Sequence, residues 1–205
     1  MYNMSVINPG YATDNVGTYN FGGIYRAQWV GAEGAPSTAS LFFHTPINDN
    51  FETGFNLVHD AIGEGVVNET TLSGDLAYRV KLNNSAKLSF GVKAGLNLFS
   101  TNFNGFKLND DNISSDPSFQ NISQGYFNLG AGAFYFTDKY YVGVSAPNFL
   151  PNKQLKENSG VSAIGVDEMH MFFSVVYVFD LTENIKFKPA FMTKIVKNAP
   201  LSADI

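Results

Sequence analysis

Three histidines, His44, His59 and His170, are the first candidates for chemistry in this sequence. A protein metal site needs several imidazole, thiolate or carboxylate ligands at short, regular spacing. No two of the histidines are spaced in that way, and the chain contains no cysteine. His59 precedes Asp60, but a hydrolytic site also needs a distinct nucleophile. We therefore expect no catalytic residue, no metal and no cofactor, and a structural hydrogen bond for His44.

Charged residues at the polar positions of alternating segments form a second group of candidates. They can line a lumen that holds an extended peptide or guides a solute. Alternatively they neutralise one another in a packed interior, because a lone buried charge is costly; Glu69 and Asp75 would then offset Arg79 and Arg26. The candidates for partner or lumen binding are Arg26, Gln28, Trp29, Glu69, Asp75, Arg79, Lys93, Lys186, Lys188 and Lys194.

Some of these candidates have more specific interpretations. Lys186, Lys188 and Lys194 form a positive stripe on one side of a segment, although Lys186 and Lys188 also fit a position at the rim. Trp29 is the only tryptophan, and it suits either an interfacial anchor or a surface that grips a partner. The acidic segment 109–116 offers oxygen ligands for calcium, but it lacks the EF-hand spacing, so a solvated loop is expected.

The elements that position these residues are β-strands, as strict alternation indicates. In residues 66–82, Leu76, Tyr78 and Val80 alternate with Asp75 and Arg79, and only a strand places these two sets on opposite faces. The same pattern predicts strands at residues 19–29, 38–45, 52–60, 66–82, 87–98, 125–136, 140–146, 168–180 and 186–196, with a tenth strand beginning near Leu201.

The connections between the predicted strands alternate in length. Short turns fall at residues 48–50, 83–86, 137–139 and 181–184, and longer stretches fall at 30–37, 61–65, 101–123 and 148–167. Short turns at one end and long loops at the other are typical of outer-membrane barrels. The predicted strands are long enough to span a bilayer, which takes about 9–11 residues, and aromatic residues near their ends fit interfacial girdles.

Composition narrows the function classes. The 205 residues carry a net charge of −5 and only 15% charged residues, against about 25% in soluble domains. The absence of a basic patch argues against a nucleic-acid partner, and no apolar run approaches the ~18 residues of a transmembrane helix. A soluble all-β sandwich remains possible, but the long apolar faces and sorted loops favour an all-β, antiparallel transmembrane outer-membrane β-barrel.

The predicted organisation is a single domain over residues 1–205. Residues 1–17 would form an N-terminal periplasmic segment, and residues 18–205 would supply the barrel strands. A spanning sheet must close on itself because lipid offers no hydrogen-bond partners. Nine strands and a fragment do not give the usual even number, so we expect the barrel's further strands to lie outside this chain. Residues 1–10 lack the pattern of a signal peptide, so an exported protein would be represented here in mature form.

Several blocks resemble the PorP/SprF family of outer-membrane proteins of the Bacteroidetes type IX secretion and gliding machinery. They follow one another in the family's order along almost the whole chain, and Gly10 and Thr13 are modest departures. The blocks are Asn8-Pro9-Gly10-Tyr11-Ala12, residues 26–31 with 34–36 and 43–47, residues 132–148, and residues 177–181 with 186–189 and 197–201.

The resemblance implies a non-enzymatic role in the outer membrane. Members of the family are needed for the secretion or surface attachment of particular substrates, often adhesins. The implied partners are outer-membrane lipid, the C-terminal sorting domain of a secreted adhesin, and periplasmic ring components of the secretion machine. From the residues alone, two other functions stay open: a porin-like channel or small-solute transporter, and an enzyme barrel.

Overall fold

The regular secondary structure of the described residues is almost entirely antiparallel β-strand, as the alternation predicts. The computed structural model describes residues 3–13, 16–104, 121–150, 152–153 and 166–205. Its main sheet has ten strands in the order β1-β2-β3-β4-β5-β6-β7-β10-β13-β14. These strands are β1 (Asn20–Ala27), β2 (Ser37–Pro46), β3 (Phe51–Ile62), β4 (Val67–Lys81), β5 (Ala86–Thr101), β6 (Ile122–Thr137), β7 (Tyr140–Asn148), β10 (His170–Tyr177), β13 (Ala190–Val196) and β14 (Ser202–Asp204).

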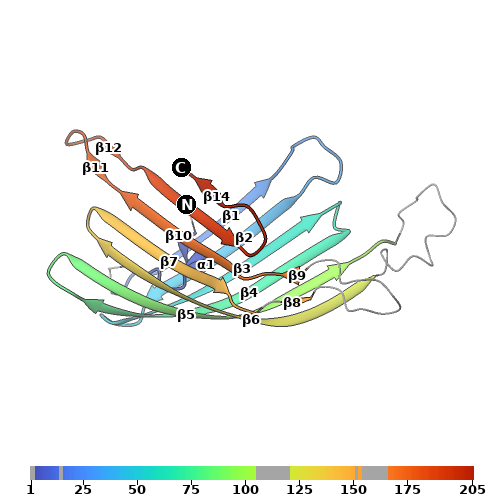
Figure 1. Ribbon diagram of the computed structural model, residues 1–205, viewed down its shortest axis with the longest axis horizontal. Helices are drawn as coiled ribbons and strands as arrows, with labels where there is room; N and C mark the ends of the chain where they lie inside the picture. Colours follow the sequence, from blue (N-terminus) through green and yellow to red (C-terminus); the bar gives the residue numbers. More distant parts are fainter. Residues whose placement is uncertain (1–2, 14–15, 105–120, 151, 154–165) are drawn as a thin grey trace.

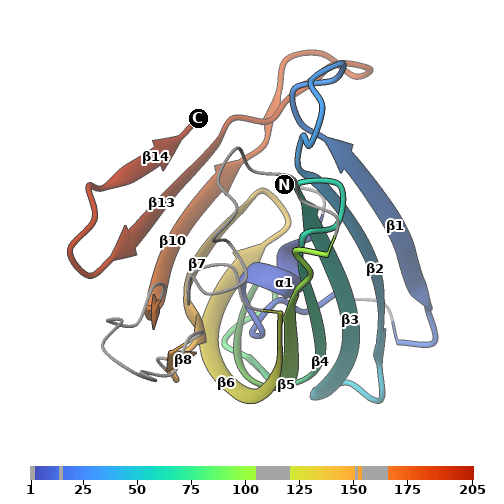
Figure 2. The same ribbon diagram turned by 90° about the vertical axis from the view of Figure 1, so that its right-hand side faces the viewer.

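The main sheet curls into a deep trough. Figure 2 shows β1 and β14 as its two edges, facing each other across an opening, with the central strands forming the floor. Figure 1 shows the same strands side by side and strongly tilted, with their connections gathered at two opposite ends. The described strands therefore form an open β-barrel, and the predicted all-β antiparallel class is confirmed.

Polar and apolar side chains alternate between the two faces of the sheet, but the polar ones are buried and the apolar ones are exposed. On β4, Asp75 and Arg79 are 8% and 3% exposed, whereas their neighbours Leu76 and Tyr78 are 44% and 45% exposed. In a soluble domain, large apolar side chains are mostly buried and polar side chains are mostly exposed. Along this sheet the arrangement is reversed. The convex face is thus apolar and the concave face is polar.

The predicted strands match the observed ones closely, except at the C-terminal hairpin. The segment predicted as one strand over 168–180 is divided into β10 and β11 (Phe179–Asp180), and the one over 186–196 is divided into β12 (Lys186–Phe187) and β13. Strand β12 pairs with β11. The break in the second segment falls at Pro189, because proline has no N–H to donate to a strand ladder. Its carbonyl accepts from the Tyr177 amide at 3.2 Å, which keeps the two halves of the hairpin connected.

The connections confirm most of the predicted sorting, with one error. Residues 61–65 were predicted as a long stretch, but β3 and β4 are joined by a tight turn at residues 63–66. Gly63, Glu64 and Gly65 all have positive φ, between 56° and 86°, and two glycines make this backbone accessible at little steric cost. The strand ends that flank the other long stretches lie at the same end of the sheet as this turn.

Outside the main sheet, the described residues form helix α1 and two short strand pairs, one of which is β11 with β12. Helix α1 (Met4–Ile7) lies within the trough (Figure 2). A short pair is formed by β8 (Asn152–Lys153) and β9 (Val166–Asp167). In the described ranges, no helix has the length and apolar character needed to cross a membrane.

Candidate functional site

The N-terminal segment, residues 3–13, occupies the concave face of the sheet. Helix α1 packs against β3 and β7, and the chain then crosses β5 and β6. The described part of the segment that the sequence predicts to be periplasmic, residues 3–13, lies against the inner face of the strands. Asn8 is 1% exposed, and it and Pro9 are among the most completely buried side chains in the described structure. The centre of the molecule is therefore formed by the chain's own N-terminal segment.

A strip without side chains on the sheet makes room for this segment. Gly91 of β5 pairs with Gly132 of β6, and both face the trough. A Cβ atom at Gly91 would overlap the Pro9 carbonyl, and one at Gly132 would overlap the Asn8 side chain. The main chain of Asn8-Pro9-Gly10 thus rests directly on the backbone of the sheet, a close approach that only glycine allows.

Asn8 fixes the turn of the segment and ties it to the sheet. Its Oδ1 accepts from the Gly10 amide at 2.8 Å, which is the local bond that asparagine favours in turns. Its Nδ2 donates to the carbonyls of Ala133 at 3.1 Å and Val144 at 3.4 Å, on two neighbouring strands. The Asn8 side chain therefore closes the turn through its oxygen and binds β6 and β7 through its amide nitrogen.

Lys93 and Asp75 form a buried pair beneath α1. Lys93 Nζ lies 3.6 Å from Asp75 Oδ1 and donates to the carbonyls of Ser5 and Val6, each at 2.8 Å. A helix leaves its last carbonyls unsatisfied, and here an ammonium group supplies the donor. Asn56 completes the arrangement by donating to Asp75 Oδ2 at 2.7 Å while accepting from Ser5 at 3.0 Å.

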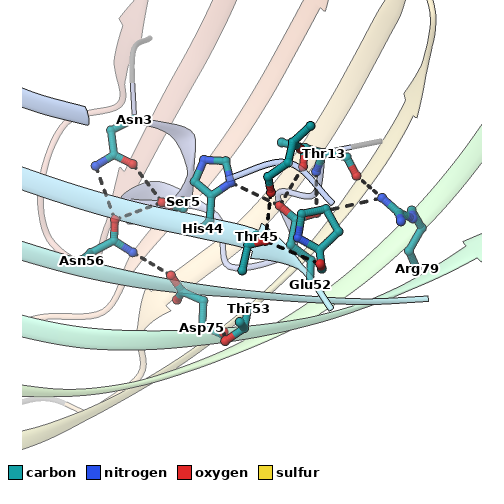
Figure 3. Close-up of polar contacts among 12 residues, drawn as sticks. Asn3, Ser5, Thr13, His44, Thr45, Glu52, Thr53, Asn56, Asp75 and Arg79 are labelled. Atoms are coloured by element: carbon teal, nitrogen blue, oxygen red, sulfur yellow. Dashed lines mark hydrogen bonds and ion pairs between the residues drawn. The ribbon is translucent and has the colours of Figure 1, made fainter. Parts of the chain in front are cut away.

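Glu52 is the centre of a second cluster, at the short-turn end of the trough (Figure 3). This carboxylate is 3% exposed. It accepts from the Thr13 amide at 2.6 Å and hydroxyl at 3.1 Å, and lies 3.2 Å from His44 Nδ1 and 3.9 Å from Arg79 Nη1. Arg79 also donates to the Thr13 carbonyl. The structural hydrogen bond predicted for His44 is confirmed, and the cluster holds the end of the N-terminal segment.

We predict that Glu52→Gln destabilises the protein by about 1–3 kcal/mol, the cost of leaving a buried hydrogen-bonding group without its partner. The amide keeps the size of the carboxylate but replaces one acceptor oxygen by a donor that faces Thr13, His44 or Arg79. Denaturant unfolding measures the loss. Glu183→Gln, at an exposed turn, is the matched control and should change stability by less than about 0.5 kcal/mol. Equal effects of the two substitutions would contradict this role for Glu52.

The structure corrects the predicted charge pairing. Asp75 pairs with Lys93, and Arg79 lies near Glu52, which the analysis of polar-face charges omitted. Glu69 accepts from the Tyr126 hydroxyl at 3.2 Å and from Asn97 at 3.4 Å. On this part of the face the buried charges meet opposite charges or main-chain carbonyls, which favours neutralisation in a packed interior over lumen binding.

Three further candidates, Arg26, Glu69 and Lys194, lie at the long-loop end of the trough. Arg26 and Glu69 are in one row across β1 to β4, with Thr38 and Asp60 between them, as the strand register shows. Lys194 lies near the same end of β13 and is half-buried. We call the surface formed by Arg26, Thr38, Asp60, Glu69 and Lys194 the mouth. It carries charges of both signs at the end from which the long connections extend.

Gln28 and Trp29 lie beside the mouth, in the connection between β1 and β2. The Gln28 amide donates to the Pro36 carbonyl at 3.0 Å, which closes the loop. Trp29 is 74% exposed and has a φ of 47°, a left-handed conformation uncommon for a bulky residue. The loop therefore presents the indole of Trp29 to the surroundings.

Lys186 and Lys188 do not belong to the mouth or to the interior. Both are exposed at the short-turn end, and Lys186 Nζ lies 3.8 Å from Asp180, which also pairs with Lys139 at 3.2 Å. The predicted stripe with Lys194 is therefore wrong, because the break at Pro189 separates β12 from β13. Their rim position agrees with the alternative interpretation.

The remaining candidates are simply placed. His59 Nδ1 lies 2.8 Å from the Thr70 hydroxyl, and His170 stacks on Phe172. In the described ranges, no group of three or more histidine, cysteine, aspartate or glutamate side chains is arranged to hold a metal ion. Segment 109–116, considered for calcium, lies outside the described residues.

The N-terminal segment is the part of the site that the sequence does not reveal. Two signals pointed to it: Asn8-Pro9-Gly10 is a turn sequence, and Gly91 and Gly132 occupy polar-face positions where a lumen would otherwise carry side chains. Neither signal identifies the other as its partner, because the two are far apart in the chain.

The comparisons with known proteins agree with the sequence resemblance. The family model described as type IX secretion system membrane protein PorP/SprF matches residues 1–205, the whole chain. No curated protein matched the chain.

Proposed function

The chain belongs to the PorP/SprF family of type IX secretion system membrane proteins, and we propose that it is an outer-membrane β-barrel subunit that docks secreted cargo. Its cargo would be the C-terminal sorting domain of a surface adhesin, and its own role would involve no catalysis. Family membership places it in type IX secretion or gliding. Lipid and periplasmic ring components are further proposed partners.

The inverted sheet is the observation that carries the membrane assignment. Large apolar side chains such as Leu76, Val92 and Phe127 are 44%, 59% and 75% exposed on the convex face. In water, contiguous apolar surface of this extent marks an interaction site. Strands that alternate between an apolar outer face and a polar inner face are the pattern of barrels in outer membranes.

The mouth is the proposed cargo surface. It lies at the end of the long connections, which face the exterior in outer-membrane barrels. Trp29 is exposed beside it, and tryptophan and arginine are enriched among the residues that dominate binding energy at protein interfaces. The interior below the mouth is already occupied by residues 3–13, which leaves the rim and loops for a partner.

We predict that Arg26→Ala and Trp29→Ala each weaken capture of a purified adhesin C-terminal domain by the detergent-solubilised protein. A loss of about 2 kcal/mol for each anchor corresponds to an affinity decrease of roughly 30-fold. Lys188→Ala, an exposed cation at the opposite end, is the matched control and should bind like the unmodified chain. Undiminished capture by both variants would exclude the mouth as the docking surface, and absence of capture by the unmodified chain would reject cargo docking.

A porin-like channel is the competing function, and the position of the N-terminal segment argues against it. Residues 3–13 lie across the trough, and their main chain contacts the strands directly. Planar-bilayer recordings distinguish the two functions. A docking subunit with this interior should show no large open-channel current, whereas a steady large conductance would favour the channel.

A further inference from the structure

We propose that the inner face of β3–β7 is a peptide-binding site whose resident ligand is the chain's own residues 3–13. The site, called here the glycine seat, is formed by Gly91, Gly132, Lys93, Ser145 and Arg79. We infer that it binds a segment of this sequence through contacts that do not need the covalent link, so that it also accepts the segment as a separate peptide. This inference is independent of cargo docking at the mouth.

The seat recognises the main chain of its ligand. Lys93 donates to the carbonyls of Ser5 and Val6, and the Ser145 hydroxyl donates to that of Ile7 at 2.8 Å. At the other end, Arg79 donates to the carbonyl of Thr13. Side chains of the sheet thus satisfy carbonyls that α1 leaves without a partner inside the helix, and these bonds do not depend on the ligand's own side chains.

Sequence specificity in the seat comes from the Asn8-Pro9-Gly10 turn. The Asn8 amide bridges the carbonyls of Ala133 and Val144, and the turn lies against Gly91 and Gly132, where any Cβ atom would collide with it. A further polar contact is made by Thr13, whose amide and hydroxyl both reach Glu52. The ligand class is therefore a peptide with an Asn-Pro-Gly turn followed by a small hydroxyl residue.

The position of the segment does not follow from its place in the chain. Residues 3–13 precede β1, which pairs only with β2 in the sheet. The Asn8 side chain instead contacts Ala133 on β6 and Val144 on β7, which lie 125 and 136 positions further along the chain. The segment crosses to the far strands because the seat binds it, and a short helix such as α1 has little stability of its own.

Ser89 provides a reporter for occupancy of the seat. It lies on β5 between Arg79 of β4 and Phe134 of β6 in the strand register. Arg79 contacts Thr13, and the ring of Phe134 lies 5.4 Å from that of Tyr11. The segment therefore passes over Ser89, which is 0% exposed. Because the chain has no cysteine, Ser89→Cys would be the only thiol for a water-soluble maleimide.

The experiment compares labelling of Ser89→Cys in detergent-solubilised protein with and without residues 1–13. We expect slow labelling in the full chain, labelling at least about tenfold faster in the shortened chain, as for a contribution of 1.4 kcal/mol or more, and renewed protection by a synthetic peptide of residues 3–13. A peptide with Asn8→Ala should protect poorly. Asn84→Cys, at an exposed turn, controls for reagent activity and should label rapidly throughout.

Two variants keep the test decisive if the shortened chain does not fold. Asn8→Ala in the full chain leaves the seat intact but removes the amide bonds, so it should accelerate labelling, and the added peptide should slow it again. Gly132→Ala blocks the seat, so the peptide should give no protection; outward-facing Gly74, where a Cβ atom meets nothing nearer than 3.9 Å, supplies Gly74→Ala as its control. Unchanged labelling in Asn8→Ala, or no protection by the peptide at an intact seat, would overturn the proposal.

Discussion

Replacement of Lys93 by methionine should destabilise the protein by about 3–5 kcal/mol, the cost of removing one partner of a buried ion pair. Asp75 would keep the hydrogen bond from Asn56 but would lose the only cation within 4 Å that the described structure gives it. The carbonyls of Ser5 and Val6 would also lose their shared donor. Methionine preserves most of the length of the side chain, so the loss of charge dominates the effect.

Denaturant unfolding in detergent or vesicles measures this change. Lys186→Met is the matched control, because Lys186 is 68% exposed and its pair with Asp180 is open to solvent; exposed pairs contribute about 0–1 kcal/mol. The double variant Lys93→Met with Asp75→Asn removes both charges and should regain part of the stability. Equal stability of the Lys93 and Lys186 variants would show that the interior is open to water and not packed around residues 3–13.

Introduction of arginine at Val92 should cost about 2–4 kcal/mol in phospholipid vesicles, the penalty for a cation at the midplane of a membrane barrel. Val92 lies in the middle of β5, is 59% exposed on the convex face, and pairs with Leu76. For a water-facing side chain with this exposure, the same substitution should change stability by less than about 0.5 kcal/mol. The two environments therefore predict clearly different results.

The control for depth is Leu82→Arg. Leu82 is 54% exposed and directly follows β4 at the short-turn end, where the cost of arginine falls to about 0–1 kcal/mol. Unfolding in vesicles should thus separate the two variants by more than 1 kcal/mol. Indistinguishable stability of Val92→Arg, Leu82→Arg and the unmodified chain would contradict a membrane around the convex face.

The strands and their faces could be predicted from the sequence because strand alternation is local. Asp75, Leu76, Tyr78 and Arg79 reveal their opposite faces through adjacent positions alone. Hairpin pairing follows just as directly, since consecutive strands joined by short turns have few other partners. The errors arose where a single residue altered the backbone locally, as at Pro189, or where glycine tightened a turn, as at Gly63.

The sequence indicates which charged residues belong to the candidate site, but not which groups they contact. Asp75, Arg79 and Lys93 were recognisable as polar-face charges, but their partners were not, because pairing across a curled sheet depends on register and on what fills the interior. Glu52 has the same alternating position as many surface residues, and only its burial beside Thr13 distinguishes it. Asn8 gave no sign of reaching Ala133 and Val144.

By itself, the sequence determined an antiparallel all-β chain with an apolar and a polar face, the approximate limits of its strands, and its family. The tertiary structure alone decided that the polar face encloses residues 3–13, which charges meet, and which remain at the mouth. The physical reason is the range of the interactions. Alternation and turn chemistry act between neighbours in the chain, whereas the contacts among Asn8, Gly132 and Lys93 exist only after the sheet has curled around the N-terminal segment.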